Sequence, residues 1–270
     1  MIMKSVKKKR GARLGQHFLT GEWAARALAE AVQIRAGETV LEIGPGKGAL
    51  TKHLLETGGN VIAIEKDEKL AKDLEVIFPH EIASGRLIVL ADDVRNFDAQ
   101  RLNLGAGKYV LAANIPYYIT GEIIRQFLSI AAQPRAMALL IQKEVADRII
   151  ARNHKESILS LSVKIFGTPR IIAKVSKGNF SPPPSVDSAI LLVNDISKSA
   201  FADVSERDFF RVVKAGFSSK RKFLANNLAN EFSKETVAHA FAQSELALNI
   251  RAEDVTIAQW LTITERLSST

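Results

Sequence analysis

The chain has 270 residues, of which 47% are hydrophobic and 24% are charged, a composition typical of a folded globular protein with one or two domains. It contains no cysteine, which excludes disulfide frameworks, thiolate zinc sites and cysteine nucleophiles. No apolar run approaches the roughly 18–20 residues that a membrane-spanning helix needs, so no membrane association is expected.

Lys and Arg number 37 against 29 Asp and Glu, a formal net charge of +8. Six cations and no acid lie within the first 13 residues, so the rest of the chain is almost neutral. Such an arm is typical either of a solvated tail or of a segment that binds nucleic-acid phosphates. A secretory signal is not expected, because no apolar segment follows the cations.

From residue 39 onward, short apolar segments alternate with amphipathic ones. The apolar segments are rich in Val, Ile and Leu, which indicates buried strands. The amphipathic segments indicate helices, and Leu70, Leu74, Ile77 and Phe78 form the predicted buried face of one. This alternation predicts an α/β fold with a mostly parallel sheet. The predicted strands are 39–43, 61–64, 87–91, 109–113 and 136–141, and the predicted helices are 49–56, 68–78, 121–131 and one from residue 143.

Two later apolar segments, 171–175 and 189–193, are expected to form an antiparallel edge of the sheet. Beyond the polar stretch 194–199 the pattern indicates helices only, at 206–216, 221–232, 234–243 and 256–267. We therefore divide the chain into a basic arm and loop (1–21), an α/β domain (22–195) and a helical domain (196–270). A helical unit of this size is expected to pack against the larger domain.

A glycine-rich turn follows the first predicted strand, where residues 44–48 read Gly-Pro-Gly-Lys-Gly. Glycine permits positive φ and lets a ligand approach the backbone at the carboxyl edge of a parallel sheet. A glycine triplet alone also fits an ordinary tight turn. The strand before it and the helix after it favour a nucleoside-binding loop.

Glu65 ends the second strand, 21 residues after Gly44, where a carboxylate can accept hydrogen bonds from both hydroxyls of a ribose. This feature alone does not separate NAD from S-adenosylmethionine. Glu42 before the glycines, and Asp92 and Asp93 after the third strand, favour S-adenosylmethionine, whose amino and sulfonium groups are cationic. Additional carboxylates would repel a pyrophosphate. No metal site is expected.

The segment Asn114-Ile115-Pro116-Tyr117 follows the fourth strand. In isolation it fits a simple turn, but beside a nucleoside pocket it suits methyl transfer to an exocyclic amine. The lone pair of such an amine is delocalised into the ring. Hydrogen-bond acceptors, here the Asn114 amide oxygen and the backbone carbonyl of Ile115 or Pro116, favour a tetrahedral nitrogen and stabilise its developing charge. Tyr117 is expected to stack on a flipped base.

With these motifs the chain resembles the KsgA/RsmA-type rRNA adenine N6,N6-dimethyltransferase family, which shares a superfamily with the Erm methylases. The resemblance runs from about residue 14 to residue 260. It rests on seven ordered segments: 15–19, 42–51, 114–120, 142–146, 180–189, 220–228 and 251–253.

The resemblance implies a Rossmann-like class I methyltransferase domain with a small C-terminal all-helical domain, and S-adenosylmethionine as the cofactor. It implies dimethylation at N6 of two adjacent adenosines in the 3′-terminal hairpin of small-subunit rRNA, in an immature ribosomal subunit in the cytoplasm. The implied catalytic residues are Asn114, Tyr117 and Phe180, the last as the second stacking face. The cofactor residues, with two loop positions added, are His17, Leu19, Glu42, Gly44, Gly46, Glu65, Asp93 and Asn114.

The chain departs from the family pattern at two of these positions. His17 stands where the family most often has Asn, and imidazole can donate or accept one hydrogen bond in its place. Tyr118 replaces a frequent Asn. Of the two neighbouring acids, Asp93 matches the family step before Val94 and is favoured over Asp92 for the contact with adenine. The prolines at 182–184 are expected to hold Phe180 over the base pocket.

Two cationic patches are predicted to bind rRNA phosphates: Lys7, Lys8, Lys9, Arg10 and Arg13 in the arm, and Lys220, Arg221 and Lys222 at the start of a predicted helix. Two alternatives remain. One is an Erm-like methylase of large-subunit rRNA, against which the proline run and segment 251–253 count. The other is a non-catalytic small-subunit assembly factor, against which the intact segment 114–117 counts. A monomer is expected.

Overall fold

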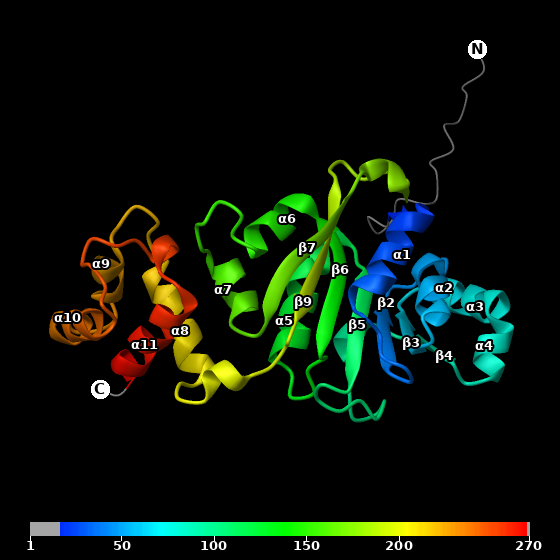
Figure 1. Cartoon of the computed structure of the whole chain (residues 1–270), viewed down its shortest axis with the longest axis horizontal. Helices are drawn as coiled ribbons and strands as arrows, with labels where there is room; N and C mark the ends of the chain where they lie inside the picture. The colour runs from blue at the N-terminus through cyan, green and yellow to red at the C-terminus, as the bar shows by residue number, and fades with distance from the viewer. Residues whose placement is uncertain (1–16, 269–270) are drawn as a thin grey trace, which may run out of the picture.

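The computed structural model of the protein describes residues 17–268 and shows a twisted mixed sheet covered by helices on both faces, with further helices at one end (Figure 1). The seven strands of the sheet are β2 (Thr39–Ile43), β3 (Asn60–Glu65), β4 (Leu87–Ala91), β5 (Tyr109–Asn114), β6 (Ala136–Gln142), β7 (Thr168–Val175) and β9 (Ser188–Asn194).

The order of the strands is β4-β3-β2-β5-β6-β9-β7. The first five are parallel, and β9 runs antiparallel between β6 and β7. The predicted α/β class, the parallel strands and the antiparallel edge are therefore confirmed. Strand β2 has β3 on one side and β5 on the other, so the connections that leave the carboxyl ends of the strands diverge beside it. Ligands of open α/β sheets usually bind at such a point.

Two apolar clusters cover the two faces of the sheet. One face packs on α1 (Glu22–Ala31), α2 (Ala49–Glu56) and α3 (Glu68–Ile77). The other packs on α5 (Thr120–Ser129), α6 (Lys143–Ile149) and α7 (Ile158–Lys164). A short helix, α4 (Pro79–Ala83), follows α3. Alternate residues of each central strand therefore enter different clusters, as strand geometry requires.

The C-terminal part is helical, as predicted, with α8 (Glu206–Gly216), α9 (Leu224–Leu228), α10 (Lys234–Gln243) and α11 (Ile257–Ser268). Phe209 of α8 and Trp260 of α11 belong to the apolar cluster that covers the α5–α7 face of the sheet. The aromatic rings of Phe166 and Phe201 lie 5.3 Å apart and link the two parts. The helical part therefore shares a core with the sheet, and the division at residue 195 stays a prediction.

Several local predictions were wrong or incomplete. The predicted helix 221–232 is only α9, so Lys220, Arg221 and Lys222 lie in the turn before a helix, not in its first turn. Asn227 causes part of this: its buried amide donates to the carbonyls of Gly216 and Ser219 and closes that turn. Ile77 is 52% exposed instead of buried. Helices α1, α4 and α7 had not been predicted.

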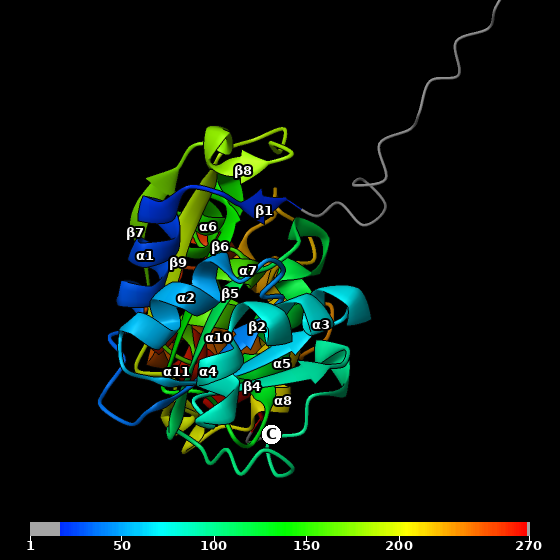
Figure 2. The same ribbon diagram turned by 90° about the vertical axis from the view of Figure 1, so that its right-hand side faces the viewer.

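A two-stranded ribbon lies apart from the main sheet and joins distant segments of the chain. Strand β1 (Phe18–Leu19) pairs antiparallel with β8 (Phe180–Ser181), as Figure 2 shows at the top of the molecule. The ribbon brings the segment before α1 beside the proline run and places both above the carboxyl edge of β5. Among residues 17–268, no helix is long and apolar enough to cross a bilayer.

Candidate active site

A pocket of about 410 Å³ lies at the carboxyl edge of the sheet, where β2 separates β3 from β5. Its walls come from the β1–β8 ribbon, the glycine loop, the ends of β3, β4 and β5, and the 3-10 helices η1 (Val94–Asn96) and η2 (Tyr117–Ile119). It brings together most of the residues predicted from the sequence. The predicted residues that line it are His17, Leu19, Gly44, Gly46, Glu65, Asp93, Asn114, Tyr117 and Phe180.

The glycine loop needs glycine for two physical reasons. Gly44, Gly46 and Gly48 have φ of +69°, +58° and +80°, which side chains rarely adopt. A Cβ on Gly46 would also lie 3.1 Å from the Phe18 ring, and one on Gly48 would lie 2.6 Å from the Phe78 ring. The loop therefore forms a tight backbone cradle at the start of α2.

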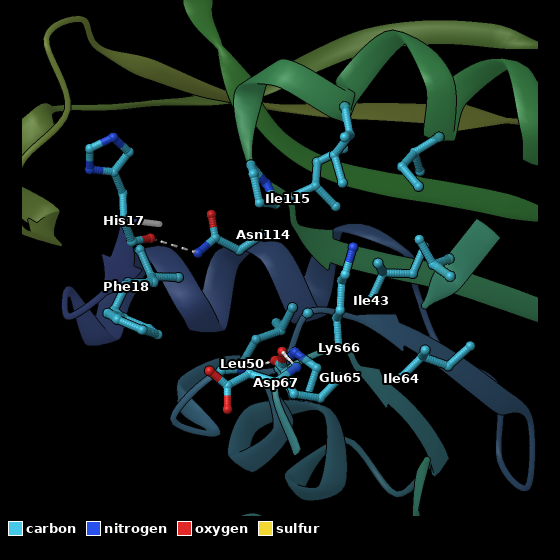
Figure 3. A pocket seen from close by; sticks show the side chains of 18 of the residues that line it. His17, Phe18, Ile43, Leu50, Ile64, Glu65, Lys66, Asp67, Asn114 and Ile115 are labelled. Carbon is cyan, nitrogen blue, oxygen red and sulfur yellow. Dashed lines mark hydrogen bonds between the residues drawn. The ribbon is translucent and has the colours of Figure 1, made fainter. Parts of the chain in front are cut away.

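Glu65 ties this loop to the end of β3. Its carboxylate accepts hydrogen bonds from the Gly46 N–H at 3.0 Å and from the Asp67 N–H at 2.9 Å, one on each oxygen (Figure 3). Each oxygen retains a second lone-pair direction. The side chain is buried and fixed in place, with acceptor capacity left for the hydroxyls of a ligand.

Asp93 is surrounded by cationic side chains. It caps η1, forms a two-point ion pair with Arg95 and accepts from Lys66 at 2.8 Å. The hydrogen bonds from Arg95 hold the pKa of the Asp93 carboxyl well below its usual range, so it is ionised at neutral pH. Asp92 also lines the pocket, but its carboxylate accepts from the Asn96 amide and the Asp93 N–H.

Lys66 and Arg95 were missed by the sequence analysis, although both line the pocket. Their positions carried a usable signal: Lys66 directly follows the acid at the end of β3, and Arg95 lies two residues after Asp93. Phe18 was also missed as a pocket residue. It packs over Gly46, and the Lys47 ammonium lies 5.0 Å from the centre of its ring.

Asn114 ends β5 with its side chain in the pocket. Its Nδ2 donates to the backbone carbonyl of His17 at 3.3 Å, which Figure 3 draws as a dashed line. Since a carbonyl only accepts, this contact assigns the nitrogen and leaves Oδ1 available as an acceptor. The His17 ring turns elsewhere: its Nδ1 donates to the Pro182 carbonyl at 2.7 Å.

Two aromatic side chains flank this acceptor. The Tyr117 hydroxyl shares a hydrogen bond of 2.7 Å with Ser188 of β9, and burial raises the pKa of the tyrosine. Phe180 is 4% exposed and is placed by the pairing of its backbone with Leu19. Contacts between distant parts of the chain therefore fix both rings at the pocket. The site combines a carboxamide acceptor, two aromatic walls and a glycine cradle.

Glu42 is the predicted cofactor residue that the structure does not bring to the pocket. It lies within β2 with no exposed surface, behind the glycine loop. Of the predicted RNA-binding residues, Lys7, Lys8, Lys9, Arg10 and Arg13 lie outside the described residues. Lys220, Arg221 and Lys222 are exposed. Figure 1 places α8 and α9, which this turn joins, in the helical part at the left of the molecule.

Solved structures share this fold. A 23S rRNA methyltransferase, ErmE, is 23% identical with a TM-score of 0.75, over 93% of this chain and 99% of its own. A dimethyladenosine transferase from Plasmodium falciparum is also 23% identical with a TM-score of 0.75, over 92% and 96%. At this identity the likeness shows the fold alone.

Closer relatives carry a common name. A "Ribosomal RNA small subunit methyltransferase A" of Dehalococcoides mccartyi is 37% identical, over 92% of this chain and 84% of its own. A protein of the same name from Synechococcus elongatus is 35% identical over 92% of each. The model of the family described as "Ribosomal RNA adenine dimethylase" matches residues 7–269. On this match across nearly its whole length, the chain belongs to the ribosomal RNA adenine dimethylase family.

Proposed function

We propose that the chain dimethylates N6 of two adjacent adenosines in the 3′-terminal hairpin of small-subunit rRNA, using S-adenosylmethionine. The observation that carries this proposal is Asn114, whose amide oxygen is free to accept at a pocket flanked by Tyr117 and Phe180. An acceptor between two aromatic rings suits a flipped base with an exocyclic amine.

S-adenosylmethionine is the methyl donor of this family, and the residues present fit it. The backbone cradle of Gly44 and Gly46 lines the pocket and would hold the methionine part. Glu65 has acceptor capacity for both ribose hydroxyls. We assign Asp93 to the amino group of adenine, which would replace one of the contacts that Arg95 and Lys66 make with this carboxylate. When bound, this cofactor supplies an electrophilic methyl group on a sulfonium.

The chain's own residues then act on the base. Tyr117 and Phe180 hold the adenine ring between them. The Asn114 oxygen and the backbone carbonyl of Ile115 or Pro116 accept from its amino group, which favours a tetrahedral nitrogen and directs the lone pair toward the methyl group. The nitrogen loses its proton to water after transfer, so no strong base is needed.

The alternatives have weaker support. The likeness to ErmE at 23% identity concerns the fold, whereas the relatives at 35–37% identity are named for the small subunit. A purely non-catalytic assembly factor gains no support from the complete pocket. We further propose that the enzyme works as a monomer in the cytoplasm on an immature small subunit, where a flexible hairpin remains accessible.

Mapping of the transferred methyl groups tests the proposal. Small subunits prepared without these methylations are incubated with the purified protein and labelled S-adenosylmethionine, and the modified positions are read on the rRNA. We expect two adjacent N6,N6-dimethyladenosines in the 3′-terminal hairpin, with large subunits as the matched control substrate. Label confined to large-subunit rRNA, or no label on either, contradicts it.

A further inference from the structure

Glu42 is the least satisfied polar side chain near the pocket. It has no exposed surface, and neither carboxyl oxygen has a hydrogen-bond partner among the described residues. The hydroxyl of Thr51 in α2 is equally buried and unpartnered. The backbone neighbours of Glu42 in the sheet are Ala63 on β3 and Ala112 on β5, which carry no charge.

An ionised carboxylate in such surroundings is costly, because burial removes its hydration and only Thr51 of α2 lies near enough to offer donors in its place. Burial raises the pKa of Glu42 to about 8, and the negative charge of Glu65 acts in the same direction. The hydroxyl and the backbone N–H of Thr51 lower the pKa of Glu42, but by less than burial raises it. Glu42 therefore holds a proton at neutral pH in the protein without cofactor.

Glu42 also lies close behind the cofactor cradle. It precedes Gly44 by two residues, and the Glu65 that acts on it accepts from the Gly46 N–H. Among the charged groups on the strands and helices packed around Glu42, Glu65 of β3 raises the pKa of Glu42. His53 of α2 is buried and forms a hydrogen bond with Glu56. A positive charge that enters the pocket lowers the pKa of Glu42 through a medium of low dielectric.

We propose that Glu42 is a positioning residue whose protonation state follows the charge of the bound ligand: it is ionised while the cationic methyl donor is bound and protonated while the product is bound. It releases a proton to solvent when S-adenosylmethionine binds. In the reaction the sulfonium–carbon bond breaks, the nitrogen–carbon bond forms, the sulfonium becomes a neutral thioether, and the amine loses its proton to water. Glu42 then takes a proton back from water, because S-adenosylhomocysteine no longer carries the sulfonium charge.

This exchange keeps the net charge of the pocket nearly constant through the cycle. The ionised Glu42 attracts the cationic donor, and the protonated Glu42 offers no such attraction to the product. The residue therefore favours the donor over the product without touching either. Gln at this position preserves shape and removes the titration.

Calorimetry in buffers of different ionisation enthalpy tests the proposal by counting the protons exchanged when ligand binds. At pH 7.5 we expect the wild-type protein to release up to one more proton with S-adenosylmethionine than with S-adenosylhomocysteine. In Glu42→Gln the two counts should be equal, and the preference for the donor should fall. Glu68→Gln, an exposed acid at the start of α3, is the matched control and should behave as wild type.

If Glu42→Gln does not fold, proton counts on the wild-type protein at several pH values test the proposal instead. The difference between donor and product should shrink as the pH rises from 7.5 to 9.5, since Glu42 is then ionised before either ligand binds. Equal proton counts for the two ligands at pH 7.5 overturn the proposal. A difference that persists unchanged in Glu42→Gln assigns the proton to another group and overturns it as well.

Discussion

At the scale of single residues, Asn114 has the clearest orientation in the site. Its nitrogen donates to the His17 carbonyl, so the oxygen is the atom left to accept a hydrogen bond in the pocket. His17 contributes through its backbone, and its ring contacts Pro182. This explains how His can occupy a position where the family most often has Asn: the carbonyl that orients Asn114 is the same for every residue type.

Asn114→Ala should therefore lower kcat by about 10²–10³-fold, the range found when one preorganised hydrogen-bonding group is removed from an active site. The affinity for rRNA should be largely unchanged, because the phosphate contacts remain. Single-turnover methylation and RNA binding are the two measurements. Asn60→Ala, an exposed asparagine at the opposite edge of the sheet, is the control. An unchanged methylation rate contradicts the role of Asn114.

Phe180→Ala should weaken turnover on rRNA more than it weakens cofactor binding. Loss of one stacking face costs about 1–3 kcal/mol, which is roughly 5- to 150-fold in kcat/KM. Calorimetry with S-adenosylmethionine and rates with rRNA separate the two effects, and Phe180→Tyr should restore most of the rate. Equal losses in both measurements would assign Phe180 to the cofactor instead of the base.

At the scale of elements, the glycine loop joins β2 to α2 through a turn that leaves no room for side chains. Gly48 precedes the first residue of α2, and its missing Cβ is the space filled by Phe78 at the end of α3. The shape of the glycine loop and its packing against Phe78 and Leu74 therefore depend on the same residue.

Gly48→Ala should reduce the free energy of unfolding by about 1–3 kcal/mol from backbone strain, with an added cost from the contact with Phe78. Gly58→Ala is the matched control, since Gly58 has φ of +87° with no atom within 4 Å of the added Cβ. Urea unfolding of both variants measures the difference. Equal destabilisation would show that Phe78 moves aside freely and that packing against Gly48 contributes little.

At the scale of the whole molecule, the net positive charge is concentrated at two places. One is the arm of residues 1–13, and the other is the exposed turn with Lys220, Arg221 and Lys222, closed by the buried amide of Asn227. The described chain begins at His17, which lines the pocket. We expect both groups of cations to contact the phosphates of a folded RNA hairpin.

Replacement of Lys220, Arg221 and Lys222 by Gln should flatten the dependence of rRNA affinity on salt. Each lost phosphate contact removes about 0.7–0.9 from the slope of log K against log salt, so the three together remove roughly 2–3. Removal of residues 1–13 should act in the same way. Binding of S-adenosylmethionine should not change. Gln at Lys69, Lys72 and Lys108 removes the same exposed charge elsewhere, and a slope lowered equally by that control would contradict specific anchoring.

Elements whose residues form a strong local pattern were predictable from the sequence alone. The parallel strands were predictable because each is a short apolar run, and the glycine loop and Glu65 because strand ends place them at one edge. The prediction of a helix over 221–232 was wrong at its start, where the chain forms a turn. The Asn227 amide donates to carbonyls of this turn, and hydrophobic periodicity gives no sign of such a contact. The predicted burial of Ile77 was also wrong: in α3, Leu74 is buried, whereas Ile77 is half exposed to solvent.

The way the pocket is closed, and the choice of acids that line it, follow from contacts between distant parts of the chain. The β1–β8 ribbon rests on two residue pairs separated by more than 160 positions, too short for a local signal, yet it places His17 and Phe180 at the pocket. Glu42 and Glu65 are both acids at ends of neighbouring strands in the sequence. The pleat of the sheet sends Glu42 into the core, and the strand end leaves Glu65 at the cradle. The sequence shows that both residues are acids, whereas the burial and the hydrogen-bond partners of each carboxyl group arise from packing.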